Sequence, residues 1–323
     1  MKIAILGAGG LGKAAAHILA QKESHTLVAI ADAGGYAFNP NGLDAHEIGN
    51  VKIGGSVSQL KDGQASDDSI GDIIRLKDEY DGVFIALPNL PNDFIPGVVE
   101  RFVDGGFEGA LVDALKRTRA MEMIFDLDPL LKAHNCTFLS GCGATPGLLT
   151  AAAALAAQSF VKIESVKIWW GVGIERWDDY KATIREDIAH LPNFDVESAK
   201  ALSDTQVQEL LDTTEGKLTL HDMEHADDVM LERAGVCGRE QVTVGGVMDT
   251  RSPKKPVSTT MTLRGVTFDG QTSEHQFVLG DETTMAANVC GTALGYLSRA
   301  HWLRERGIYG VFGSAEMMPL WEK

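Results

Sequence analysis

The stretch of residues 112–118 combines the residue types that could do chemistry, because an apolar run ends there in an acid, a lysine and an arginine. The apolar residues 109–112 predict a buried strand, which places Lys116 just past the carboxyl end of that strand. Ligands of open α/β sheets bind at that edge. A lysine in this place can clamp a phosphate, form an ion pair, or attack a carbonyl carbon as an amine. The stretch alone leaves these three roles open.

A glycine-rich turn follows the first predicted strand, residues 3–6, and opens the first predicted helix. The turn consists of Gly7, Ala8, Gly9, Gly10, Leu11 and Gly12, a G-x-G-x-x-G pattern. Gly7 permits the tight turn, Gly9 lets the backbone approach a pyrophosphate, and Gly12 allows close packing of helix on strand. The helix N-terminus supplies free N–H donors for an anion. In this strand–turn–helix context the pattern predicts dinucleotide binding.

Two further predicted strands end in residues that could contact the same cofactor. The strand at 26–31 is followed by Asp32, whose carboxylate favours a ribose 2′-hydroxyl and therefore NAD over NADP. The loop at 33–36 could reshape that pocket, so the expected cofactor is NAD(P)H; it opens a stretch, 33–67, that we expect to be irregular and polar. The strand at 82–87 stops at a proline-rich loop that we expect to pass over the nicotinamide ribose. The candidate contacts there are Leu87, Pro88 and Asn89.

A loop of small residues follows the predicted strand at 136–139 and begins with Gly141, Cys142 and Gly143. Such residues leave backbone N–H groups free near a helix N-terminus, which suits a carboxylate or the nicotinamide amide. Thr145 is expected to cap the next helix, with Pro146 at its first position. Cys142 has no histidine partner nearby in sequence, so we interpret it as a small packing residue rather than a nucleophile.

The order of predicted elements changes near residue 146. Before it, strands and helices alternate, which predicts a Rossmann doubly wound parallel sheet. After it, strands separated by polar turns predict an α+β domain with a mainly antiparallel sheet. We expect an NAD(P)-binding domain at 1–145, a substrate domain at 146–282, and a C-terminal helix within 283–323 that packs back on the first domain. In the second domain we expect one or two strands within 161–172, strands at 241–248, 259–263 and 276–279, and helices at 177–190, 198–212 and 222–234.

Two polar clusters in the second domain are candidates for function. Tyr180 and Arg185 are candidate substrate contacts, and Arg185 could hold a carboxylate bidentately or belong with Lys181 to a surface salt-bridge ladder. His221 and His225 lie among acidic residues without a zincin pattern, so we expect no metal site. His225 could transfer protons, but the residues alone favour a solvated surface position for it.

Composition limits the classes of partner. The 323 residues carry a formal net charge of −16 without a compensating basic patch, which argues against nucleic-acid and anionic-membrane partners. The four cysteines show neither disulfide nor metal-ligand spacing. The chain begins with a predicted strand rather than a signal peptide, and its longest apolar run is too short to span a bilayer. We therefore expect a cytoplasmic enzyme. The sequence leaves its oligomeric state open, and a homo-oligomer is one of the possibilities.

Several of these stretches resemble saccharopine dehydrogenase-like oxidoreductases, namely the glycine-rich turn, the Ala-Leu-Pro-Asn strand end and the loop at 141–147. More narrowly, the chain resembles the BioU family of cyanobacterial-type biotin synthesis. Members of that family are suicide (S)-8-amino-7-oxononanoate synthases, or 8-amino-7-oxononanoate carboxylating dehydrogenases. The resemblance runs essentially from end to end and is carried by residues 112–118, 141–159, 182–190, 223–228 and 242–255. Its most specific motif is Asp-Ala-Leu-Lys-Arg-Thr at 113–118.

The resemblance implies a single-turnover reaction. The Lys116 amine would form a Schiff base with the 7-oxo group of 8-amino-7-oxononanoate, and reduction with NAD(P)H would give a secondary amine. The substrate would take up CO2 or bicarbonate as a carbamate. Re-oxidation on the lysine side and hydrolysis would release 7,8-diaminononanoate carbamate and leave Lys116 as allysine. The resemblance also makes His225, within Met-Glu-His-Ala-Asp-Asp, the proton-transfer or carboxylation residue, against the interpretation from the residues alone.

Two alternatives stay open at this point. The first is a multiple-turnover imine reductase of the saccharopine or carboxynorspermidine type, in which Lys116 positions the substrate and survives turnover. The second is a nucleotide-sensing protein that binds the cofactor without catalysing any reaction.

Overall fold

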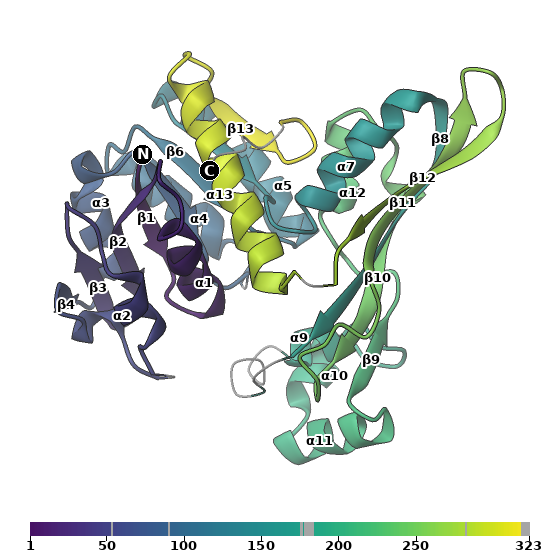
Figure 1. Ribbon diagram of the computed structural model, residues 1–323, viewed down its shortest axis with the longest axis horizontal. Helices are drawn as coiled ribbons and strands as arrows, with labels where there is room; N and C mark the ends of the chain where they lie inside the picture. Colours follow the sequence, from purple (N-terminus) through teal and green to yellow (C-terminus); the bar gives the residue numbers. More distant parts are fainter. Residues whose placement is uncertain (53, 90, 175–176, 178–183, 282, 318–323) are drawn as a thin grey trace. The chain divides into compact units, whose positions relative to one another are not determined.

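The computed structural model describes residues 1–323 apart from 53, 90, 175–176, 178–183, 282 and 318–323 (Figure 1). The chain divides into two compact units. The first comprises Met1–Ala151 and Met285–Lys323, and the second comprises Ala152–Thr284.

The first unit is built on a parallel-rich sheet with the strand order β13-β7-β6-β5-β1-β2-β3-β4. The strands are β1 (Lys2–Leu6), β2 (Thr26–Asp32), β3 (Gly35–Phe38), β4 (Gly63–Ala65), β5 (Gly82–Ile85), β6 (Ala110–Asp113), β7 (Thr137–Ser140) and β13 (Gly310–Gly313). The antiparallel pairs are β2 with β3 and β3 with β4, at one edge of the sheet. Consecutive strands run outward from β1 to β4 and then return to the other side of β1 at β5. The order therefore reverses beside β1, the position where open α/β sheets bind ligands.

Helices connect these strands and cover the sheet. They are α1 (Gly10–Leu19), α2 (Ala45–Gly49), α3 (Ser69–Arg75), α4 (Phe94–Asp104), α5 (Thr118–Asp126), α6 (Asp128–Ala133) and α13 (Met285–Arg304), with short 3-10 turns at Val57–Gln59 and Lys77–Glu79. Helix α7 (Leu148–Ala156) follows β7 and runs from the first unit into the second, where a 3-10 turn at Ala157–Ser159 comes next. Every residue of β5, β6 and β7 is buried, as expected for parallel strands covered on both faces.

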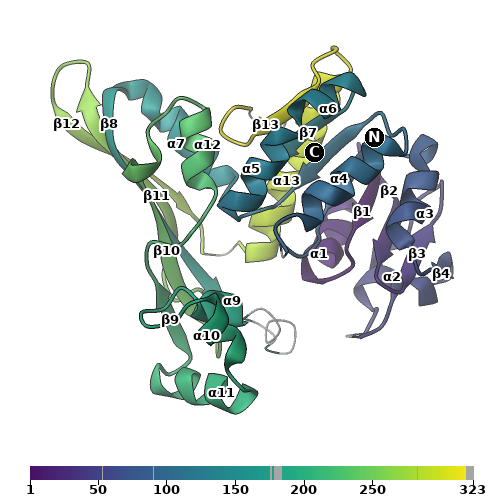
Figure 2. The ribbon, with the colours of Figure 1, turned by 180° about the vertical axis from the view of Figure 1, so that it is seen from behind.

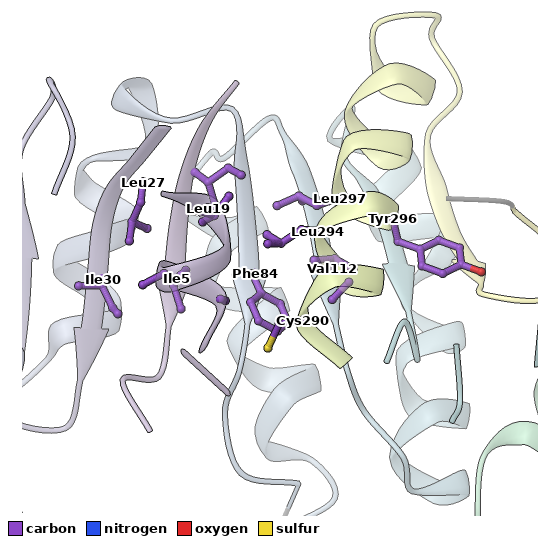
Figure 3. Packing of buried hydrophobic residues seen from close by; sticks show 14 of the residues in the cluster. Ile5, Leu19, Leu27, Ile30, Phe84, Val112, Cys290, Leu294, Tyr296 and Leu297 are labelled. Atoms are coloured by element: carbon purple, nitrogen blue, oxygen red, sulfur yellow. The ribbon is translucent and has the colours of Figure 1, made fainter. Parts of the chain in front are cut away.

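The long helix α13 packs against α1 and across β5, β6 and β7. Figure 3 shows Cys290, Leu294 and Leu297 of α13 among the same apolar cluster as Phe84 of β5 and Val112 of β6. All five side chains are fully buried. Helix α13 thus packs in the core against β6, the strand that leads to Lys116.

The second unit contains a five-stranded sheet with the order β12-β11-β8-β10-β9. The strands are β8 (Phe160–Gly173), β9 (Lys217–Leu220), β10 (Val242–Asp249), β11 (Thr259–Thr267) and β12 (Thr272–Leu279). Its helices are α9 (Ile184–Ile188), α10 (Val196–Ala201), α11 (Asp204–Thr213) and α12 (Asp227–Arg233), with a 3-10 turn at Arg239–Gln241. Figures 1 and 2 both show α9, α10 and α11 gathered at the end of the sheet where β9 lies.

The predicted fold class is confirmed: a Rossmann-type parallel-rich sheet accompanies a second, mainly antiparallel sheet. The exception in the second sheet is the parallel pair of β8 and β10. Residues 160–173 form one continuous strand. Among the described residues, no helix combines the length and the apolar character that crossing a bilayer requires.

Several element predictions were wrong in detail. The stretch 33–67 is not irregular throughout, since it contains β3, α2 and β4. Residues 118–133 form two helices, α5 and α6, because Pro129 in the first turn of α6 cannot donate a backbone hydrogen bond to α5. The helix expected at 198–212 is also two, because Leu202 is extended and Ser203 with Gln206 forms a new capping box. Strands β9 and β13 were not predicted.

Candidate functional site

Lys116 lies where the sequence predicts it, in the connection between β6 and α5. Strand β6 ends at Asp113 and α5 begins at Thr118, and the Lys116 side chain between them is half-buried. Arg117, the N-cap residue of α5, donates from Nε to the Oδ1 atom of Asn92 at 3.1 Å. Asn92 belongs to the loop after β5. This bond therefore joins the Lys116 loop to the neighbouring strand-end loop.

Asp113 is a site residue that the sequence interpretation missed, and its side chain is completely buried (0% exposed). Its Oδ1 atom accepts hydrogen bonds from the backbone N–H of Leu115 at 3.1 Å and of Gly141 at 2.7 Å. The Ser140 hydroxyl contacts both carboxylate oxygens, at 3.0 and 2.8 Å. Burial raises the pKa of the Asp113 carboxyl to about 6, although the hydrogen bonds from Gly141, Leu115 and Ser140 lower it in part.

The loop after β7 is held by Asp113 as well. The Gly141 N–H donates to the Asp113 carboxylate, and the Cys142 N–H donates to the Asp113 carbonyl oxygen at 2.9 Å. The expectation of free N–H groups at these two residues was therefore wrong. Burial raises the pKa of the Cys142 thiol well above its usual range, so this cysteine stays protonated and packs as a small apolar residue.

The same loop folds back on itself before α7. The Leu148 N–H donates to the Gly143 carbonyl oxygen at 2.9 Å, and a Cβ on Gly147, whose φ is +134°, would lie 1.8 Å from that oxygen. Only glycine fits at this position. The peptide bond between Thr145 and Pro146 is cis, and α7 begins at Leu148. The expected N-cap at Thr145 with Pro146 in the first helical position was thus wrong.

The glycine-rich turn has the geometry that a dinucleotide requires. A Cβ on Gly7, whose φ is +99°, would lie 2.3 Å from the Ala86 carbonyl oxygen, and a Cβ on Gly12 would lie 1.8 Å from the Gly7 oxygen. In contrast, nothing lies within 4 Å of a Cβ placed on Gly9 or Gly10. Gly9 is the N-cap of α1 and brings no side-chain cap. The helix N-terminus is therefore open to a pyrophosphate group, and the turn fits the predicted cofactor.

Asp32 holds its surroundings through both carboxylate oxygens. Oδ1 accepts from the Gly34 N–H at 2.9 Å and from the Ser56 hydroxyl at 2.6 Å, and Oδ2 accepts from the Val57 N–H at 2.8 Å. A carboxylate offers about four acceptor positions, so these three bonds leave room for a ribose hydroxyl. Asp32 thus ties the stretch after β2 to the segment at 56–57, which the sequence did not reveal.

The remaining candidate cofactor contacts lie along the same edge of the sheet. Leu11 is half-buried in the first turn of α1. Leu87, Pro88 and Asn89 follow the end of β5, where Leu87 and Asn89 are half-buried and Pro88 is exposed.

In the second unit, His225 is buried and paired with an acid. The His225 ring is 5% exposed, and its Nδ1 atom lies 2.6 Å from Oδ2 of Asp227, which is 0% exposed. The Met223 N–H donates to the Val244 carbonyl oxygen at 2.9 Å, which fixes the segment before His225 against β10. The preference for a solvated surface position was wrong. Asp227 is a site residue that the sequence interpretation missed. Its position two residues after His225, at the start of α12, is the feature of the sequence that could have revealed the pair.

The other candidates in this unit have different surroundings. His221 is exposed, in contrast to the buried His225, and its ring lies 5.3 Å from that of Trp169. Arg185 forms an ion pair with Asp204 at 2.6 Å and donates from Nε to the Leu202 carbonyl oxygen at 3.0 Å. Tyr180 lies outside the described residues.

Solved structures with a similar fold include several dehydrogenases. A DAP dehydrogenase of C. glutamicum in complex with DAP has a TM-score of 0.60 at 15% identity, over 98% of this chain and 93% of that chain. An engineered D-amino acid dehydrogenase bound to NADP+ has a TM-score of 0.59 at 17% identity, with the same coverage. A saccharopine dehydrogenase from Saccharomyces cerevisiae has a TM-score of 0.58 at 11% identity, over 97% of this chain and 94% of that chain.

No family model matches the chain. A curated relative, the (S)-8-amino-7-oxononanoate synthase BioU of Haloferax mediterranei, is 45% identical over 99% of this chain and 99% of its own. Identity of this extent shows that the two proteins are related along the whole chain. The chain therefore belongs to the BioU family of (S)-8-amino-7-oxononanoate synthases.

Proposed function

We propose that this protein acts in biotin biosynthesis, where it converts 8-amino-7-oxononanoate to the carbamate of 7,8-diaminononanoate in a single turnover that consumes Lys116. The observation that carries the proposal is the position of Lys116. In a chain of the BioU family, this amine lies at the carboxyl edge of a dehydrogenase sheet, two strands away from the glycine-rich turn. A nucleophilic lysine at that edge can meet both a carbonyl substrate and a hydride donor.

The chain supplies both the nucleophile and the nitrogen. The Lys116 amine adds to the substrate C7 carbonyl and loses water, which gives a Schiff base. Its reduction leaves C7 and Cε of Lys116 joined through one secondary amine nitrogen. Oxidation on the Cε side moves the double bond to the lysine, and hydrolysis breaks the Cε–N bond. The nitrogen leaves with the product and Cε remains as an aldehyde, so the reduction at C7 balances the oxidation at Cε.

A nicotinamide cofactor, when bound, supplies the hydride for the first redox step and accepts one in the second. We assign its binding to the glycine-rich turn and Asp32, with Leu87, Pro88 and Asn89 as further contacts. The open N-terminus of α1 supports this assignment. The neighbouring fold bound to NADP+ supports a nicotinamide cofactor in general. We place cofactor binding in residues 1–145 and substrate binding mainly in 146–282.

We assign proton transfer during carboxylation of the substrate amine by CO2 or bicarbonate to His225. The Asp227 carboxylate at Nδ1 stabilises the tautomer that carries a proton on Nδ1, which leaves Nε2 as the nitrogen that exchanges protons. Arg185 already binds Asp204 and the Leu202 carbonyl oxygen, and these contacts connect α9 with α11. A structural role for Arg185 is therefore at least as well supported as the binding of a substrate carboxylate.

The amount of product per chain tests this proposal. With excess 8-amino-7-oxononanoate, NAD(P)H and bicarbonate, we expect product to stop at about one molecule per protein chain, because the amine is spent. NAD(P)H absorbance should show no net loss at the end, since reduction and oxidation cancel. A multiple-turnover imine reductase would instead exceed one product per chain and consume one NAD(P)H each time. Cofactor binding without any product would favour a nucleotide-sensing protein.

A further inference from the structure

We propose that Asp113 is the positioning residue for Lys116, because it fastens the loop that carries this lysine to the loop that begins at Gly141. This inference rests on the proposed function, in which the lysine amine must meet a carbonyl carbon in a defined orientation.

The junction lies where the backbone ladder between two strands stops. Strands β6 and β7 pair up to Val112 and Leu139. Beyond this pair the Asp113 carboxylate connects the two chain segments. It accepts hydrogen bonds from Ser140 and Gly141 after β7 and from Leu115 after β6. Two loops that diverge from a sheet edge are thereby held together by one buried side chain.

The consequence for Lys116 follows from its neighbours on both sides. Leu115 is fixed by its N–H bond to Asp113 and by its side chain, which is only 1% exposed. Arg117 is fixed by its bond to Asn92. The contacts of Leu115 and Arg117 therefore restrict the loop that carries Lys116. Misplacement of a reacting group by about 1 Å can cost on the order of 100-fold in rate.

The hydrogen bonds of Asp113 allow a test that distinguishes its role in holding the two loops from the effect of its negative charge. Both backbone N–H donors reach the same oxygen, Oδ1, and the Ser140 hydroxyl lies 2.8 Å from the other oxygen, Oδ2. An asparagine can reproduce this arrangement, because its oxygen accepts both N–H groups and its amide donates to the Ser140 oxygen. Asp113→Asn thus keeps the junction without the negative charge, whereas Asp113→Ala removes the junction.

The test compares these two variants by the rate at which the Lys116 adduct appears in intact-protein mass spectra. The protein is first loaded with NAD(P)H and then mixed with 8-amino-7-oxononanoate. We expect Asp113→Asn to stay close to the wild-type rate and Asp113→Ala to be about 100-fold slower while still binding NAD(P)H. Should Asp113→Ala fail to bind the cofactor, Asp113→Ser, which leaves a smaller cavity, replaces it. Adduct formation at the wild-type rate in Asp113→Ala or Asp113→Ser would overturn the positioning role. A rate in Asp113→Asn as low as that in Asp113→Ala would overturn it as well.

Hydrogen–deuterium exchange provides a second measurement that does not depend on the reaction. Peptides covering 114–117 and 140–143 should exchange faster together in Asp113→Ala and remain protected in Asp113→Asn. Unchanged protection in Asp113→Ala would contradict the junction itself. If the wild-type protein forms no adduct, the proposed function fails, and the exchange data still decide whether Asp113 joins the two loops.

Discussion

Replacement of Lys116 by alanine should abolish product formation, with a loss of more than about 10⁴-fold, the scale seen when a covalent nucleophile is removed. The reason is chemical: alanine offers neither an amine to condense with the ketone nor a nitrogen to leave with the product. Lys116→Arg should be equally inactive, because a guanidinium keeps the positive charge but does not form the Schiff base. The measurement is product per chain after prolonged incubation.

Cofactor binding is expected to survive both substitutions, because the glycine-rich turn lies two strands away from β6. Lys132→Ala serves as a matched control. Lys132 is an exposed lysine of α6 that pairs with Asp128 at 2.6 Å, and its loss should leave product per chain unchanged. Stoichiometric product from Lys116→Ala would show that the nitrogen comes from elsewhere and would favour a reductase with a free amino donor.

Replacement of His225 by glutamine should slow product release by about 10²–10⁴-fold, the range for loss of a positioned acid or base. Because we assign this histidine to the carboxylation step, the covalent adduct on Lys116 should still form and should accumulate. The measurement is the ratio of adduct to released product in time-resolved mass spectra.

Two further variants of the same segment sharpen this expectation. Asp227→Ala should reproduce the adduct accumulation, because the His225 ring then lacks the carboxylate that holds Nδ1. His221→Gln is the matched control, since His221 is exposed and lies against Trp169; it should behave as wild type. If His225→Gln forms no adduct at all, the histidine acts earlier, in Schiff-base formation, and our assignment to carboxylation is wrong.

The parts of the fold that the sequence predicts well are those with a strong local signal. The apolar runs Ile3–Leu6 of β1 and Ala110–Val112 of β6, and the glycines that follow β1, can be recognised without knowing their partners in the sheet. The short strands β9 and β13 carry only four residues each. They lack the run of three or more consecutive apolar residues that marks β1 and β6, and they are defined by pairing with β10 and β7.

The site divides in the same way. Lys116 could be found from its motif and from its place after a predicted strand. The role of Asp113 could not, because its partners Ser140 and Gly141 lie 27 and 28 residues further along the chain. The burial of His225 was hidden for a related reason. The acid-rich segment around it is typical of a solvated surface. Burial of the histidine is possible because His225 and Asp227 contact each other in the interior of the second unit, so that neither polar side chain is buried without a partner.

The central claim is that Lys116 is consumed, and mass analysis of the peptide containing position 116 tests it most directly. After product has formed, we predict that the lysine is an aldehyde, so trypsin no longer cleaves after position 116 and a hydrazide reagent labels that residue. The labelled fraction should equal the amount of product per chain. An unmodified Lys116 in protein that has already released product would contradict the account.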